Sequence, residues 1–89
     1  MARFPIWFSA SPNPTVDDCT LSFELPPAGG QDGRIEIVNL LGQVIYTTQI
    51  FSHQQFIKWD TFGVKPGMYI ASVYVGNKKM DVVNIVVAR

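Results

Sequence analysis

The side chains that could carry acid–base, nucleophilic or metal chemistry are few in this chain, and they are scattered. His53 is the single histidine, and its neighbours from residue 51 to residue 55 include no carboxylate. A Ser–His–Asp relay or a histidine metal site needs such partners around the imidazole. We therefore interpret His53 as an exposed loop residue, and we do not expect the chain to be an enzyme.

Asp17 and Asp18 are the one adjacent pair of acidic residues. Carboxylates can ligate Ca²⁺ together with backbone carbonyls, but the spaced oxygen ligands of an EF-hand loop are absent from this sequence. We interpret the pair as turn residues. The sequence also lacks a glycine-rich phosphate-binding loop. It therefore predicts no metal, no cofactor and no small-molecule substrate.

Cys19 is the only cysteine, so it cannot form a disulfide within the chain. It alternates with Leu21 and Phe23, and polar residues stand between them. This period of two places the three side chains on one face of a strand. The pattern predicts a buried thiol, and an intermolecular disulfide is the alternative.

The aromatic residues raise the question of a sugar-binding surface, because aromatic rings can stack on sugars. Small sandwiches bury most of their aromatic side chains, however, and nothing in the sequence places several of them on one exposed face. A carbohydrate-binding module is therefore a secondary hypothesis. The candidate residues are Trp7, Phe8, Tyr46, Trp59, Phe62 and Tyr74.

The chain is electrically neutral. Seven basic and seven acidic side chains cancel, and charged residues make up 16% of the 89 residues, against about 25% in typical domains. A neutral surface has no long-range field that would attract nucleic acid or an anionic membrane, and we expect neither as a partner. Residues 4–8 are too short and too aromatic for a signal peptide. Any export address would then lie elsewhere in a longer parent chain.

The hydrophobic pattern predicts an all-β fold. Apolar residues recur with a period of two, and turn residues interrupt them about every ten positions. We expect an immunoglobulin-like antiparallel β-sandwich of about seven strands, with residues 1–9 as residual linker and the start of the first strand, and 10–89 as the domain. The expected strands are 4–8, 19–25, 34–38, 44–50, 56–59, 68–75 and 78–87.

Three short segments mark the joints of this fold. Pro12 and Pro14 lack an N–H and hold Asn13 in an extended conformation, so they predict a stiff connector. Residues 39–42, Asn-Leu-Leu-Gly, fit a type I turn followed by a glycine in the left-handed region, which makes a G1-bulge hairpin. Tyr69 lies where a tyrosine corner is expected, with plain core packing as the alternative.

The last strand is apolar on both faces, over residues 82–87. Two explanations stay open. Either the strand lies between the core and a covering loop, or it is an exposed apolar edge to which another protein adds a strand. A dimer through this strand is also possible.

The order of these segments resembles one family, the C-terminal sorting domain of type IX secretion substrates of Gram-negative bacteria. The resemblance extends from about Ile6 to Arg89. The segments that carry it are 11–15 (Ser-Pro-Asn-Pro-Thr), 20–26 (Thr-Leu-Ser-Phe-Glu-Leu-Pro), 35–44 (Ile-Glu-Ile-Val-Asn-Leu-Leu-Gly-Gln-Val) and 67–69 (Gly-Met-Tyr).

The resemblance implies a non-catalytic address domain with an N-terminally fused cargo. Such a cargo enters the periplasm, and the outer-membrane secretion machinery then recognises the sorting domain. A surface sortase commonly removes the domain and joins the cargo to an anionic lipopolysaccharide; other cargoes are released. The expected location is therefore the cell surface or the medium. An immunoglobulin-like spacer within a secreted enzyme is the alternative.

Family tails often carry a lysine near the end, where this chain has an arginine that keeps the charge. The resemblance implies two sets of important residues, one for folding and one for recognition. The motif residues expected to fix the fold are Pro12, Asn13, Pro14, Asn39, Leu40, Gly42, Gly67 and Tyr69. The tail residues expected to be recognised by the machinery are Ile85, Val86, Val87 and Arg89.

Overall fold

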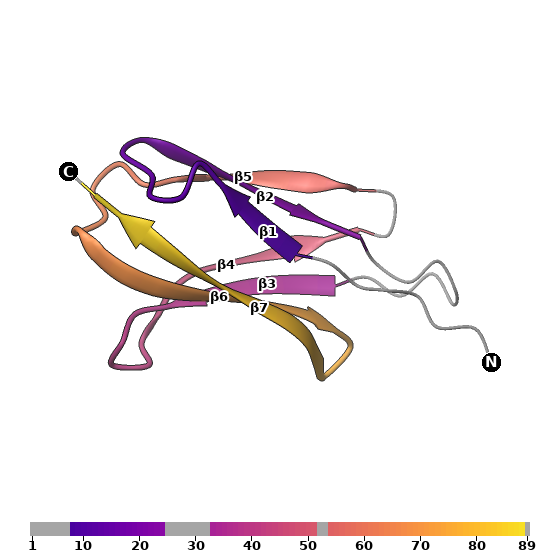
Figure 1. Cartoon of the computed structure of the whole chain (residues 1–89). Helices are drawn as coiled ribbons and strands as arrows, with labels where there is room; N and C mark the ends of the chain where they lie inside the picture. Colours follow the sequence, from indigo (N-terminus) through magenta and orange to yellow (C-terminus); the bar gives the residue numbers. More distant parts are fainter. Residues whose placement is uncertain (1–7, 25–32, 52–53, 89) are drawn as a thin grey trace.

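A computed structural model describes residues 8–24, 33–51 and 54–88 as seven β-strands without a helix. The strands form two facing sheets (Figure 1). The predicted all-β sandwich is therefore confirmed. The strands are β1 (Phe8–Ser11), β2 (Asp18–Phe23), β3 (Gly33–Val38), β4 (Val44–Ile50), β5 (Phe56–Asp60), β6 (Gly67–Val75) and β7 (Lys78–Val87).

The two sheets have three and four strands. The smaller sheet has the order β1-β2-β5 and the larger one the order β4-β3-β6-β7. Every strand pair within them is antiparallel. A single parallel bridge, from Thr15 to Val87, connects the β1–β2 connector to the last strand of the larger sheet.

The core follows from the period of two in the sequence. In β2 the side chains of Cys19, Leu21 and Phe23 point inward and are buried, while Thr20 and Ser22 are partly exposed. Burial of each large apolar side chain stabilises the fold by about 1.5–3 kcal/mol. The buried apolar residues are Phe8, Cys19, Leu21, Phe23, Ile35, Ile37, Ile50, Trp59, Tyr69, Ala71, Val73, Ile85 and Val87.

Most strand bounds agree with the sequence prediction to within two residues. β4 and β7 have the predicted bounds, and β5 extends one residue further, to Asp60. β2 spans Asp18–Phe23 where 19–25 was predicted, and Leu25 lies outside the described residues. The first strand was predicted over 4–8, but β1 spans Phe8–Ser11 and shares only Phe8 with that prediction; residues 1–7 lie outside the described residues.

Gly33 is a structural requirement that the sequence analysis missed. A Cβ atom built on it would lie 2.7 Å from the backbone oxygen of Tyr74 and 3.1 Å from the side chain of Ile50. A real Cβ does not tolerate a backbone atom at that distance, so only glycine lets β3 approach β6 so closely at this point.

Candidate functional site

The three motifs of the sequence gather at one end of the sandwich. Figure 1 shows the β1–β2 connector, the β3–β4 turn and the β5–β6 loop at the same end as the C-terminus, whereas β1 begins at the opposite end. The strand pairing agrees with this arrangement. Asp18 at the start of β2 lies opposite Asp60 at the end of β5, and Gly67 at the start of β6 lies opposite Val87 at the end of β7. We call this region the motif end, formed by residues 12–17, 39–45, 61–69 and 84–88.

The Pro-Asn-Pro connector clamps the last strand. The side-chain amide of Asn13 donates to the Asn84 oxygen at 2.7 Å and accepts from the Val86 N–H at 2.9 Å. The main chain of Thr15 donates to the Val86 oxygen and accepts from the Ala88 N–H, both at 2.8 Å. The connector thus occupies the edge of β7 from Asn84 to Ala88, whereas Val82 on the outer face of the strand stays 46% exposed, so the structure matches neither explanation in full.

The side chains next to the clamp anchor it in the molecule. Thr15 is fully buried, and its hydroxyl donates to the Asp18 oxygen at 2.7 Å. The Cys19 thiol donates to the Pro12 oxygen at 3.6 Å. The peptide bonds before Pro12 and Pro14 are both cis. The connector is therefore held on one side by the core and on the other by β7.

The β3–β4 turn has the predicted type I and G1-bulge geometry. Gly42 has φ +84° and donates its N–H to the Asn39 oxygen at 3.0 Å. The Asn39 side-chain oxygen accepts from the N–H groups of Leu41 and Gln43, at 2.9 and 3.0 Å. These bonds hold Leu40 and Leu41 at the tip of the turn, with Leu41 85% exposed. The turn presents an apolar tip on a rigid hairpin.

Tyr69 forms the predicted tyrosine corner. Its hydroxyl donates to the Lys65 oxygen at 2.5 Å, four residues upstream. Its ring is buried and meets the Trp59 ring edge-on, with 5.8 Å between the centroids. Gly67, with φ +150°, precedes it at the start of β6. The bond fixes the β5–β6 loop against the core.

The β5–β6 loop separates two open hollows at the motif end. Val16 and Phe62 line one of them, Ile45 and Tyr69 line the other, and Val64 borders both. Phe62 is 90% exposed. The sequence named Phe62 only as one of six candidates for a sugar-binding surface and gave no role to Val16; an apolar residue inside a run of turn residues is the signal that could have found them.

The sequence of this chain matches the model of one known protein family. The family described as "Secretion system C-terminal sorting domain" matches residues 9–88, which is nearly the whole chain. This chain belongs to that family. No curated protein matches it. The domain is therefore a C-terminal sorting signal of type IX secretion, and it directs export to the cell surface or the extracellular space.

The family is that of a sorting signal and not of a catalytic domain. Among the described residues, no three His, Cys, Asp or Glu side chains come together to hold a metal ion, and no helix there could span a membrane. The predicted burial of Cys19 is confirmed, and this burial raises the pKa of its thiol. Trp59 is only 2% exposed, so it cannot stack on a sugar. His53 and Trp7 lie outside the described residues.

The tail of the sorting domain divides between core and surface. Ile85 and Val87 point inward and are buried, whereas Val86 is half-buried on the other face of β7. Arg89 lies outside the described residues. Of the described tail residues, the folded domain can offer only Val86 to a partner. Recognition of the tail by the machinery stays a prediction.

Proposed function

We propose that this sorting domain carries an N-terminally fused cargo from the periplasm across the outer membrane. The secretion machinery recognises the domain, and a surface sortase then removes it. The family match over residues 9–88 carries this proposal. The domain acts as an address that other proteins read, so it needs no catalytic group of its own.

The arrangement of the sandwich supports this role. A cargo fused ahead of β1 joins the domain at the end opposite to the motif end, because β1 starts there (Figure 1). The exposed apolar side chains of Leu40, Leu41 and Phe62 then stay free of the cargo. Exposed apolar residues that gather in one region are typical of a protein-binding surface.

The tail contributes to recognition through the position of β7. Ile85 and Val87 anchor the strand in the core, and Asn13 fixes its outer edge. We propose that the machinery contacts Val86, on the half-buried outer face of the anchored strand, and Arg89, which follows in the sequence. Removing residues 85–89 would also remove core side chains, so a deletion cannot separate recognition from folding.

A reporter fusion tests the proposed function. A signal peptide, a reporter and residues 1–89 are expressed in cells with an intact type IX system and in cells without it. We expect reporter at the surface or in the medium of the first cells and in the periplasm of the second. Surface reporter in both strains, or in neither, would contradict the proposal. Loss of an epitope tag placed after Arg89 would report removal by the sortase.

A pair of point variants tests the role of the tail. Val86→Lys changes the half-buried outer face of β7, and Val82→Lys is the matched control on the same strand. We expect Val86→Lys to reduce export and Val82→Lys to leave it unchanged, while both retain the thermal stability of the unmodified domain. Equal export of the two variants would show that Val86 is not read.

A further inference from the structure

The first and the last strand of the sandwich run in the same direction. β1 begins at the end opposite to the motif end and runs toward it, and β7 runs the same way and ends there (Figure 1). A cargo fused ahead of β1 therefore pulls away from the motif end, whereas a partner that holds the tail pulls in the opposite direction. Tension between cargo and tail thus acts along the strands.

The connector and the end of β7 join these two ends of the chain directly. Thr15 and Val87 form a parallel bridge, which two main-chain hydrogen bonds of 2.8 Å hold together. The side-chain amide of Asn13 adds two bonds, of 2.7 and 2.9 Å, to the main chain of Asn84 and Val86. We call these four hydrogen bonds the clamp.

The clamp is oriented so that the tension shears it. Because the connector and β7 run parallel, a pull on the cargo slides the connector one way and a pull on the tail slides β7 the other way. Hydrogen bonds between neighbouring strands cross from one strand to the other, so all four are strained together. A pull that separated the two segments from one end would break the bonds one after another. The clamp is therefore strongest against tension between the two ends of the chain.

Both sides of the clamp are anchored in the body of the domain. On one side, Ile85 and Val87 are buried, and β7 pairs with β6 along its whole length. On the other side, Thr15 is fully buried, and the hydroxyl of the buried Thr61 donates to the Asp17 oxygen. Neither segment can swing away without losing these contacts. Tension on the two ends therefore reaches the clamp.

We propose that the clamp bears the tension between an N-terminal cargo and the C-terminal tail, so that the domain stays folded under load. This is a mechanical function in addition to the address. It rests on the proposed function, in which the machinery contacts the tail while the cargo is moved. A domain that came apart under this tension would lose the folded surface that the machinery reads.

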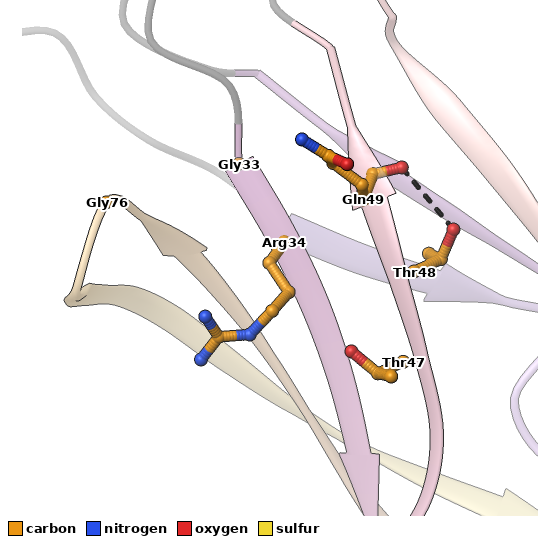
Figure 2. Close-up of a pocket in the computed structure, with 6 residues that line it drawn as sticks. All are labelled: Gly33, Arg34, Thr47, Thr48, Gln49 and Gly76. Carbon is orange, nitrogen blue, oxygen red and sulfur yellow. Dashed lines mark hydrogen bonds between the residues drawn. The ribbon is translucent and has the colours of Figure 1, made fainter.

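β4 and the β3–β4 turn lie outside the path of the tension. Among the described strands, β4 pairs with β3 alone. Figure 2 shows this pair of strands beside a hollow of about 340 Å³, with Arg34, Thr47 and Gln49 among its lining residues and the Gly76 turn at its side. None of the lining residues belongs to the connector or to β7. The hairpin of β3 and β4 therefore offers control substitutions that leave the clamp intact.

Pulling on the two ends of the purified domain tests the proposal. Handles ahead of Met1 and after Arg89 are drawn apart in an optical trap, and the unfolding rate is measured at constant force. Asn13→Ala removes two of the four bonds of the clamp. We expect it to raise the unfolding rate under load about tenfold, which corresponds to about 1.4 kcal/mol, because these bonds are broken in the transition state.

Asn39→Ala is the matched control. It removes the amide bonds that organise the β3–β4 turn, so it should lower the stability of the domain in urea. These bonds lie off the path of the tension and are still intact in the transition state under load. We therefore expect the unfolding rate under load to stay that of the unmodified domain.

The direction of the pull gives a second test that leaves the clamp residues unchanged. Leu41 is 85% exposed at the motif end, and Leu41→Cys provides a thiol for a handle there, since Cys19 is fully buried. A pull between residue 41 and the C-terminus peels β7 away from its end, so that the bonds break singly. We expect the domain to unfold at a lower force than in the pull between its two ends.

The outcomes separate this inference from the proposed function. Equal unfolding rates of Asn13→Ala and Asn39→Ala under load, or equal unfolding forces in the two directions, would show that the clamp does not bear the tension. Both measurements use the isolated domain, so such a result leaves the proposed function standing. The reporter fusion decides the proposed function independently, by the dependence of export on the type IX system.

Discussion

Asn13 and Asn39 each fix a neighbouring stretch of main chain through a side-chain amide. Asn13 bridges to a strand that lies 71 residues later in the chain, whereas Asn39 organises its own turn. An amide suits both positions because it has a donor group and an acceptor group on one short side chain. Both asparagines therefore hold the main chain of the domain itself.

Replacing Asn13 by alanine should loosen the end of β7. The substitution removes both amide hydrogen bonds, and because the site is exposed we expect a loss of about 1–2 kcal/mol of unfolding free energy. Asn13→Asp keeps the acceptor for Val86 but loses the donor to Asn84, so it should cost less. Urea denaturation of the three proteins measures this order. Equal stability of Asn13→Ala and the unmodified domain would show that Thr15 alone holds the strand.

Cys19 should make the stability depend on pH in the alkaline range. Burial raises the pKa of its thiol in the folded domain, so the folded state keeps a proton that the unfolded state releases. The free energy of unfolding should then fall as the pH rises from about 8 to 10, through the ordinary range of a cysteine. Urea denaturation across this range measures the slope. Cys19→Ala is the control and should show a smaller fall; an equal fall in both proteins would contradict the prediction.

At the scale of elements, the hairpin of β3 and β4 depends on one backbone conformation. Gly42 has φ +84°, and a Cβ placed on it would meet no atom within 4 Å. Any cost of a side chain there is therefore conformational and does not come from crowding. Gly33, at the other end of the same pair of strands, has no room for a Cβ, so the cost of a side chain there would come from crowding.

Gly42→Val should destabilise the domain more than Gly42→Asn. A β-branched residue is strongly disfavoured at positive φ, whereas asparagine tolerates it. We expect valine to cost about 1–2 kcal/mol, which lowers the midpoint of a domain of this size by roughly 4–16 °C, and asparagine to cost less than half of that. Thermal denaturation followed by circular dichroism compares them. If the two variants melted together, the turn would not need the left-handed conformation.

The sequence predicted these elements well because each depends on neighbouring residues. The alternation of Cys19, Leu21 and Phe23 places β2, and the order Asn39 to Gly42 specifies the turn. The prediction was less complete where a residue is required by contacts with residues far away in the sequence. Gly33 is required by Tyr74 and Ile50, which the chain brings near only after the sheet forms.

At the scale of the whole molecule, the sandwich buries Trp59, one of the six aromatic residues named as candidates for a sugar-binding surface. Trp59 is enclosed by Tyr46 and Tyr69, with ring centroids 6.4 and 5.8 Å away. The hollows found among the described residues at the motif end are instead bordered by the apolar side chains of Val16, Ile45 and Phe62. This arrangement favours contact with a protein.

Polysaccharides should therefore leave the fluorescence of Trp59 unchanged. In a Trp7→Phe variant the emission comes from Trp59 alone, and we expect it to shift to the red only when the domain unfolds. Titration with soluble polysaccharides, with urea unfolding as the positive control, measures both effects. A saturable change on addition of a polysaccharide would support the carbohydrate-binding alternative over the sorting role.

The sequence by itself determined the strands, the turns and the family of this protein. Alternation and turn chemistry act over a few residues, and the order of the motifs along the chain is enough to identify a sorting domain. It also indicated correctly that Cys19 is buried and that Tyr69 forms a corner.

Only the tertiary structure decided how these parts meet. It brings Asn13 to the edge of β7, turns Ile85 and Val87 into the core, and pairs β4 with β3 alone among the described strands. These relations join segments far apart in the chain, and they depend on which strands pair and in which register. A local pattern shows that a strand alternates, but it does not show which neighbour will cover it.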